Sequence, residues 1–169
     1  FAELGVVDVE RAAFLAGVSG WVLGVGMGLF APIWGIVGDR YGRRLNILRA
    51  LLLGGLFLII SGYAQNPTQL VVSRFFVGAT SGVVPTIMAL VAAHTPKEPM
   101  PLASGATMSA LLTGTAIGPV FGGVIFDNFG MLASFWATGL GLFLAALMVF
   151  SMVREDFHPP GALNSPLEP

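Results

Sequence analysis

The chain has 169 residues, of which 55% are hydrophobic and 10% are charged, whereas about 25% are charged in a typical soluble domain. The net charge of −1 offers no basic surface to a polyanion, so we expect no nucleic-acid partner. The chain lacks cysteine and has two histidines that are far apart, and we therefore expect no disulfide, no metal site and no cofactor. The composition predicts a protein that is surrounded by a lipid bilayer.

Charged residues divide the sequence into five long apolar windows. The first window contains 27 uncharged residues, from Ala12 to Gly38, and the other four contain 22 to 28 residues each. A membrane-spanning helix needs about 20 apolar residues. We therefore predict an all-α, polytopic membrane helical bundle with five transmembrane helices. They cover residues 13–37, 46–64, 69–93, 102–126 and 132–153.

The connection between the first two predicted helices, over residues 35–44, has the sequence GIVGDRYGRR. Charged side chains are costly in lipid, so the chain must leave the bilayer here. The glycines and the mixed charges predict a tight, ion-paired turn. In it Gly42 supplies a positive φ, and Asp39 pairs with Arg40, with Arg43 or with a helix N-terminus elsewhere. Because arginines alone would set the topology, the acid at position 39 indicates a function beyond topology.

The positive residues predict the orientation of the chain in the membrane. Connections on one side of the predicted bundle carry six of them: Arg40, Arg43, Arg44, Arg49, Lys97 and Arg154. Connections on the other side carry only Arg11. We therefore expect a multi-pass protein of the inner, or plasma, membrane, with the GDRYGRR turn and the C-terminal end in the cytoplasm. For Arg49 we expect no role beyond topology.

Residues 1–153 would then cross the membrane five times from an outside start. One more helix before Phe1 would restore an even number of crossings with both ends inside, so we expect that this first helix is missing. After the last window, residues 154–169 contain four prolines and no apolar run. They are interpreted as the start of a cytoplasmic linker.

Glycines recur every four residues in three of the predicted helices, on one helical face where a neighbouring backbone can approach closely. They are Gly20, Gly24 and Gly28, then Gly78 and Gly82, then Gly114, Gly118 and Gly122. Ordinary helix packing explains such stripes, and helices that rock against each other are the alternative explanation.

Two further motifs lie inside predicted helices. Arg74 lies near the start of its helix and begins the pattern R-x-x-x-G-x-x-x-G. A charged side chain inside a membrane helix is costly. We therefore expect the guanidinium group of Arg74 to lie in a polar cavity, to pair with an acidic partner, or to extend to the outer membrane interface. The pattern G-x-x-x-G-P-x-x-G-G follows in the fourth predicted helix, where the proline is expected to bend the helix. Its residues are Gly114, Gly118, Pro119, Gly122 and Gly123.

With these motifs in this order, the chain resembles the N-terminal half of a major facilitator superfamily transporter, in particular of the proton-coupled multidrug efflux branch. The loop motif of that family is G-x-L-A-D-R-x-G-R-R, and this chain departs from it mildly, with Val37 for leucine and Gly38 for alanine. The other positions match at Gly35, Asp39, Arg40, Gly42, Arg43 and Arg44. The resemblance covers nearly the whole chain.

The resemblance implies a six-helix half built from two inverted three-helix repeats, here without its first helix. It implies that the loop motif gates the cytoplasmic side, that Arg74 is associated with proton coupling, and that the glycine–proline motif marks antiporters. The expected partners are the missing first helix, a missing C-terminal half, a small-molecule substrate and protons. The expected function is secondary active export of drugs or amphipathic small molecules by alternating access, without enzymatic activity.

Two alternatives stay open on the sequence alone. A proton-coupled importer of a sugar or metabolite would share the first two motifs and lack the third. A non-transporting, truncated membrane protein would have no second half. A membrane enzyme is disfavoured, because no cluster of His, Asp and Glu and no activated nucleophile falls at a predicted helix end.

Overall fold

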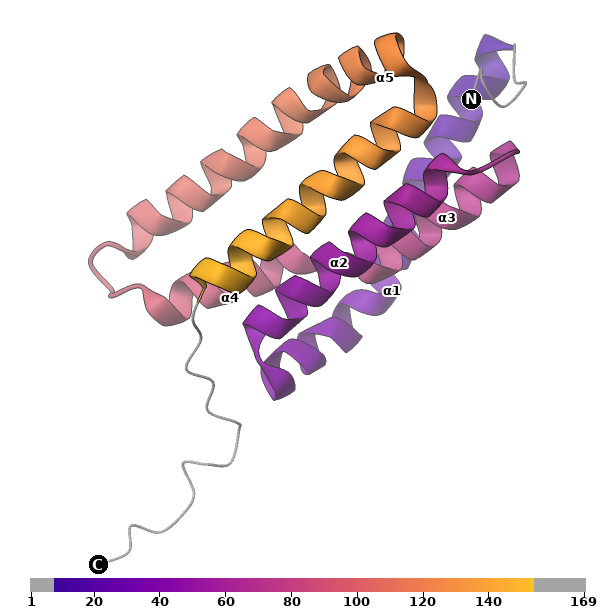
Figure 1. Cartoon of the computed structure of the whole chain (residues 1–169). Coiled ribbons are helices and arrows are strands. Elements are labelled where there is room, and N and C mark those ends of the chain that lie inside the picture. The colour runs from indigo at the N-terminus through magenta and orange to yellow at the C-terminus, as the bar shows by residue number, and fades with distance from the viewer. Residues whose placement is uncertain (1–7, 154–169) are drawn as a thin grey trace, which may run out of the picture.

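The computed structural model describes residues 8–153, and this part of the chain is built from helices. The elements are α1 (Val9–Tyr41), α2 (Arg43–Gly62), α3 (Pro67–Thr80), α4 (Val83–His94) and α5 (Met100–Met152). One residue inside α5, Gly130, has a non-helical backbone (φ 80°, ψ 179°), and the helix turns back on itself there. This bend separates a first arm, residues 100–129, from a second arm, residues 131–152 (Figure 1).

The all-α membrane bundle that the sequence predicts is confirmed, but the predicted number of five helices is not matched. Within the described residues, four helical segments are long and apolar enough to cross a membrane: α1, α2, α3 together with α4, and α5. The predicted helices 102–126 and 132–153 belong to one element of 53 residues, because the bend at Gly130 interrupts the helix for a single residue. Large apolar side chains are exposed along these helices, such as Trp21, which is 71% exposed, as a lipid-facing surface requires.

The predicted third span, over residues 69–93, lies within one apolar segment, Pro67–His94, but this segment consists of two helices. Helix α3 ends at Thr80 and α4 begins at Val83, and Gly82 between them has a left-handed backbone (φ 98°, ψ 20°). Such a residue interrupts the ladder of helical hydrogen bonds, and glycine adopts this conformation without strain. Gly82 therefore begins α4 as its N-cap and does not share a helical face with Gly78.

Helices α1 and α3 are in direct backbone contact at two glycines. A Cβ atom at Gly26 would lie 2.5 Å from the carbonyl oxygen of Phe75, and a Cβ atom at Gly78 would overlap the carbonyl oxygen of Leu23. No larger residue fits at either position unless the two helices move apart. This contact makes α1 and α3 one closely packed pair.

Helix α2 packs in the same way against the second arm of α5. A Cβ atom at Gly55 would lie 3.0 Å from the carbonyl oxygen of Gly139, and one at Gly139 would lie 2.9 Å from that of Gly55. About two turns further along α2, a Cβ atom at Gly62 would lie 3.0 Å from the Cβ atom of Phe135. These contacts join α2 and the second arm of α5 into a second packed pair.

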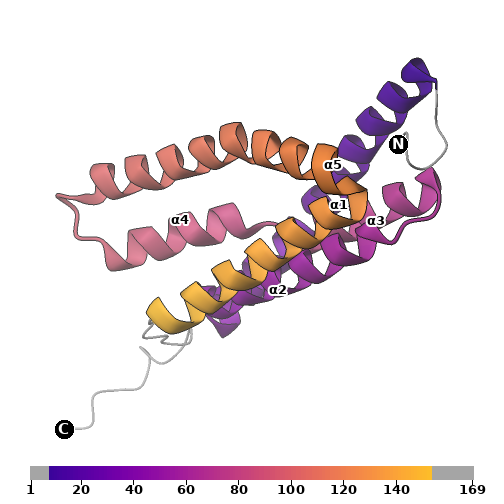
Figure 2. The same cartoon turned by 45° about the horizontal axis from the view of Figure 1, so that its top comes forward.

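Helix α4 and the first arm of α5 form a hairpin that extends away from the other helices (Figure 2). Two of the glycine stripes face no neighbour, because a Cβ atom there would meet nothing within 4 Å. They are Gly20, Gly24 and Gly28 in α1, and Gly114, Gly118, Gly122 and Gly123 in the first arm of α5. The expected packing partners of both stripes are therefore not among residues 8–153.

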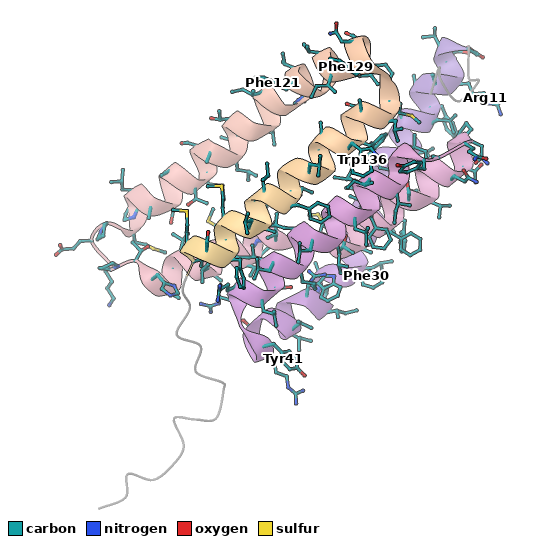
Figure 3. All side chains as sticks on the ribbon, viewed as in Figure 1. Arg11, Phe30, Tyr41, Phe121, Phe129 and Trp136 are labelled. Atoms are coloured by element: carbon teal, nitrogen blue, oxygen red, sulfur yellow. The ribbon has the colours of Figure 1, made fainter. Side chains whose placement is uncertain are left out.

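The connections between helices gather at two ends of the bundle. The α1–α2 turn, the α4–α5 connection and the C-terminal end of α5 lie at one end, and the α2–α3 connection and the bend of α5 lie at the other (Figure 1). Figure 3 shows Arg11 and Tyr41 at these opposite ends. The grouping is the one that the distribution of positive residues predicts. Residues 154–169, interpreted as a linker, lie outside the described residues.

Replacing Gly78 by alanine should destabilise the purified protein, because the new methyl group would displace the backbone at Leu23. Overpacking of this kind costs about 1–3 kcal/mol. Gly141→Ala is the matched control, since a Cβ atom at Gly141 meets nothing within 4 Å. Thermal unfolding in detergent should show a lower Tm for Gly78→Ala and an unchanged or slightly raised Tm for Gly141→Ala. A wild-type Tm for Gly78→Ala would contradict the α1–α3 contact.

Candidate functional site

Arg74 of α3 lies between two cavities. The larger cavity, of about 430 Å³, lies between α2, α3 and both arms of α5, and the smaller, of about 280 Å³, lies between α1 and α3. Ser134 and Thr138 of the second arm contribute hydroxyl groups to the larger cavity, and Ser19 of α1 contributes one to the smaller. Apolar side chains and glycines form the rest of both linings. One cation is thus surrounded by a few hydroxyl groups and mostly apolar walls, a composition typical of small-molecule sites.

The guanidinium group of Arg74 has no hydrogen bond or ion pair to any residue between 8 and 153. Its Cζ atom lies 5.2 Å from the centroid of the Phe135 ring, which is close enough for a cation–π attraction. A cation among apolar groups is costly unless an anionic partner offsets its charge. The site can therefore receive a carboxylate or another anionic group from either cavity.

The glycine–proline motif borders the same cavity as Arg74. Gly122 and Gly123 line the larger cavity, and the Ser134 hydroxyl donates a 3.0 Å hydrogen bond to the carbonyl oxygen of Gly122. This bond joins the two arms of α5 at the cavity wall. At Pro119 the backbone keeps helical φ and ψ, so the sharp change of direction in α5 falls at the glycine of the bend and not at the proline.

The GDRYGRR segment forms a one-residue turn between two helices. Helix α1 continues through Tyr41, α2 begins at Arg43, and Gly42 alone stands between them, with φ 103° and ψ 141°. The positive φ expected at Gly42 is confirmed. Its N–H donates to the carbonyl oxygen of Gly38 at 3.0 Å. Space is tight here, since a Cβ atom at Gly38 would lie 3.0 Å from Nδ2 of Asn46.

Two arginines of the segment join this turn to other helices. Arg43 Nη1 donates to the carbonyl oxygen of Ala89 in α4 at 3.0 Å, and Arg44 Nη2 donates to that of Phe150 in α5 at 2.5 Å. The Phe150 carbonyl lies in the last turn of α5, where unpaired carbonyl groups and the negative end of the helix dipole favour a cation, whereas Ala89 lies in the middle of α4. The turn therefore contacts α4 and α5 at the end of the bundle that they share.

Of the pairings expected for Asp39, those with Arg40 and Arg43 are not formed within residues 8–153, and pairing with a helix N-terminus elsewhere stays a prediction. Asp39 is exposed in the last turn of α1 and makes no hydrogen bond or ion pair to residues 8–153. Arg40 is also exposed and lies over the ring of Tyr41, with 5.8 Å between its Cζ atom and the ring centroid. Residues 39 and 40 belong to the regular helix α1, which continues through Tyr41. Successive side chains of a helix point in different directions, so Asp39 and Arg40 do not converge as they would in a loop.

A polar cluster beside the turn, formed by Trp34, Asn46, Arg49 and Thr86, was not predicted. Asn46 is 2% exposed and Thr86 is 9% exposed. Arg49, expected only to set the topology, stacks on Trp34, with 3.3 Å between its Cζ atom and the ring centroid. The signal that could have revealed this cluster is the pair of polar residues, Asn46 and Arg49, on the first turns of an otherwise apolar helix.

A family model described as Major Facilitator Superfamily matches residues 7–167. The chain belongs to the Major Facilitator Superfamily. It is 36% identical over 164 residues to the multi-drug resistance efflux pump PmrA of Streptococcus pneumoniae, with 94% of this chain and 40% of that protein covered. It is 33% identical over 157 residues to the multidrug resistance protein MdtG of Proteus mirabilis, with 93% of this chain and 39% of that protein covered.

This superfamily chain therefore spans about two fifths of the length of the curated relatives that it matches. Membership and the apolar helices make it a multi-pass protein of the plasma membrane, surrounded by the lipid bilayer. The superfamily is one of transporters and not, in general, of enzymes. Its multidrug resistance relatives also confirm the resemblance drawn from the three motifs.

Proposed function

We propose that this superfamily chain serves the secondary active export of drugs or other amphipathic small molecules, driven by protons that flow inward. The observation that carries the proposal is the position of Arg74 between two cavities, with Gly122 and Gly123 on the wall of the larger one. The residue associated with proton coupling and the motif associated with antiport thus share one cavity. The names of the PmrA and MdtG relatives, which refer to multidrug resistance, support the same substrate class.

Proton coupling follows from the charge of Arg74. An opposite charge within about 4–6 Å lowers the pKa of a carboxylate by 1–3 units. A carboxylate brought to the cavity therefore pairs with Arg74 when it is ionised and releases the cation when it takes a proton. A substrate that prefers the ionised site then competes with the proton, and this competition is the physical basis of exchange.

Alternating access needs surfaces that close on one side of the membrane and part on the other. The glycine stripes of α1 and of the first arm of α5 suit such surfaces, because no described helix covers them. In this proposal the end of the bundle that carries most positive residues is cytoplasmic. Asp39 and Arg40, both exposed there, then form the cytoplasmic gate by pairing with groups outside residues 8–153.

Arg74→Gln in the full-length transporter should abolish proton-driven export. In inside-out vesicles with an acidic lumen, the wild type should accumulate a cationic dye. Without the cation, the carboxylate in the cavity loses a pKa shift of at least about one unit, which changes its proton occupancy about tenfold. We therefore expect dye uptake to be at least about tenfold slower for Arg74→Gln. Arg11→Gln is the matched control, because Arg11 is exposed, lines neither of the two cavities beside Arg74 and should leave uptake unchanged.

The same vesicles decide the direction of transport. Export predicts that dye enters the lumen while protons leave it. If preloaded dye instead leaves the lumen together with protons, the protein is an importer and the proposal of export is rejected. A wild-type uptake rate for Arg74→Gln would instead remove the coupling role of the arginine while leaving export in place.

Asp39→Asn should impair transport without preventing membrane insertion, because it removes the charge of the proposed gate and keeps the size of the side chain. Coupling between two conformations is typically worth about 1–3 kcal/mol, so we expect a loss of at least about fivefold in maximal rate. Asp127→Asn, an equally exposed acid at the other end of the bundle, should transport like the wild type. Unimpaired dye export by Asp39→Asn at normal protein levels would rule out the gating role.

A further inference from the structure

The break between α3 and α4 leaves backbone groups that must be satisfied inside a membrane. A helix end has up to four carbonyl groups without helical partners, and lipid offers no donor for them. The Ser81 N–H donates to the carbonyl oxygen of Gly78 at 3.0 Å, and Gly82 then changes the direction of the chain. The remaining carbonyls near the end of α3 need donors from other elements.

Side chains of α1 and α2 bind the chain on both sides of this break. On the α3 side, Trp34 Nε1 donates to the carbonyl oxygen of Ala79 at 2.6 Å. On the α4 side, Asn46 Nδ2 donates to the hydroxyl oxygen of Thr86 at 3.0 Å, and it also donates to the carbonyl oxygen of Trp34 at 3.0 Å. The two donors are therefore linked to each other as well as to the two helices that they bind.

Arg49 fixes the orientation of this arrangement. Its Nε donates to Oδ1 of Asn46 at 3.1 Å, so the amide oxygen faces Arg49 and the amide nitrogen faces Trp34 and Thr86. The guanidinium group also stacks on the Trp34 ring. Both donors are thereby held in the geometry that the break requires.

One of these contacts, the Asn46–Thr86 bond, joins α2 directly to α4. Thr86 is the buried residue of α4, and the other hydrogen bond from α2 to α4 joins Arg43 to Ala89. In contrast, α3 is held to α1 by the tight glycine contact at Gly78. Trp34 and Asn46 stand on either side of the one-residue turn at Gly42, so a movement of that turn acts directly on α4.

We propose that Trp34, Asn46 and Thr86, called here the α3–α4 latch, position α4 relative to the α1–α2 turn and are positioning residues for alternating access. The inference rests on the proposed function. It adds a physical connection between the proposed gate at the α1–α2 turn and the segment formed by α3 and α4. When the latch bonds are made, α4 is held against α2. When they part, α4 and the first arm of α5 are released to move about Gly82.

The test uses the full-length transporter with one reporter cysteine at Ala93, an exposed residue near the end of α4, and no other cysteine. Trp34→Phe removes the indole N–H and keeps an aromatic face for Arg49, and Thr86→Val removes the hydroxyl acceptor and keeps the shape. Each should raise the rate of labelling at Ala93→Cys in inside-out vesicles by about two- to tenfold, as expected for the loss of one hydrogen bond. Each should also lower the maximal rate of dye export and leave KM unchanged.

Trp21→Phe and Thr115→Val are the matched controls, since Trp21 is 71% exposed and the hydroxyl of Thr115 bonds only within its own helix. Neither should change labelling or transport. If Trp34→Phe fails to insert, Thr86→Val alone decides. Wild-type labelling and maximal rate in the inserted latch variants, or equal changes in the controls, would overturn the latch. Labelling needs no transport, so faster labelling in a protein that does not export would retain the latch and reject the proposed function.

Discussion

The structure depends on one constraint: in lipid, every backbone N–H and C=O group must find its partner within the protein. Long helices satisfy this requirement by themselves, and the chain departs from helical geometry at few places between α1 and the end of α5. Each of the three glycines with positive φ, namely Gly42, Gly82 and Gly130, marks such a departure. Two of these turns, at Gly42 and Gly130, lie at ends of the bundle, where water can reach the backbone. The break at Gly82 instead lies within an apolar segment, where Trp34 of α1 donates to the backbone carbonyl of Ala79 and Asn46 of α2 binds the Thr86 side chain just beyond the break.

The same constraint explains how the helices meet. Lipid removes most of the hydrophobic gain of burying apolar side chains, so close backbone approach has to hold the helices together. The contacts at Gly78 and at Gly139 do so for the two packed pairs, α1 with α3 and α2 with the second arm of α5. The hairpin of α4 and the first arm of α5 lacks such a contact with the other helices at its own glycines. The two closely packed helix pairs can move as rigid units, and the hairpin of α4 and the first arm of α5 is free to move relative to them. Such relative movement is what the proposed transport cycle requires.

Much of this arrangement could be predicted from the sequence, because lipid imposes a simple length and polarity rule. The predicted windows end close to the observed helices, and they fall short mainly where charged residues continue a helix into water. At the start of α1, for example, Asp8 accepts a hydrogen bond from the Glu10 N–H and begins the helix four residues before the predicted span. The motifs also located the turn at Gly42 and the cavity residue Arg74.

The parts that could not be predicted depend on contacts between distant segments. Gly82 fits a helical four-residue repeat, and nothing local shows that it adopts a left-handed backbone instead. Trp34 and Thr86 are ordinary residues of apolar helices until they are brought together with Asn46, 12 and 40 residues away in the sequence. Within the described residues Asp39 does not pair with Arg40 or Arg43 for a related reason, because α1 continues through Tyr41 as a helix where a loop was expected. Spacing along the chain predicts helical faces, whereas partners across the bundle require the structure.

The central claim is that the chain crosses the membrane with its α1–α2 turn and its α4–α5 connection on the cytoplasmic side. Single cysteines at Gln65, Asn128 and Lys97 test it directly, because the native chain contains no cysteine. A membrane-impermeant maleimide should label Gln65→Cys and Asn128→Cys in intact cells, and it should label Lys97→Cys only in inside-out vesicles. Labelling of Lys97→Cys in intact cells, with protection of the other two, would contradict the account.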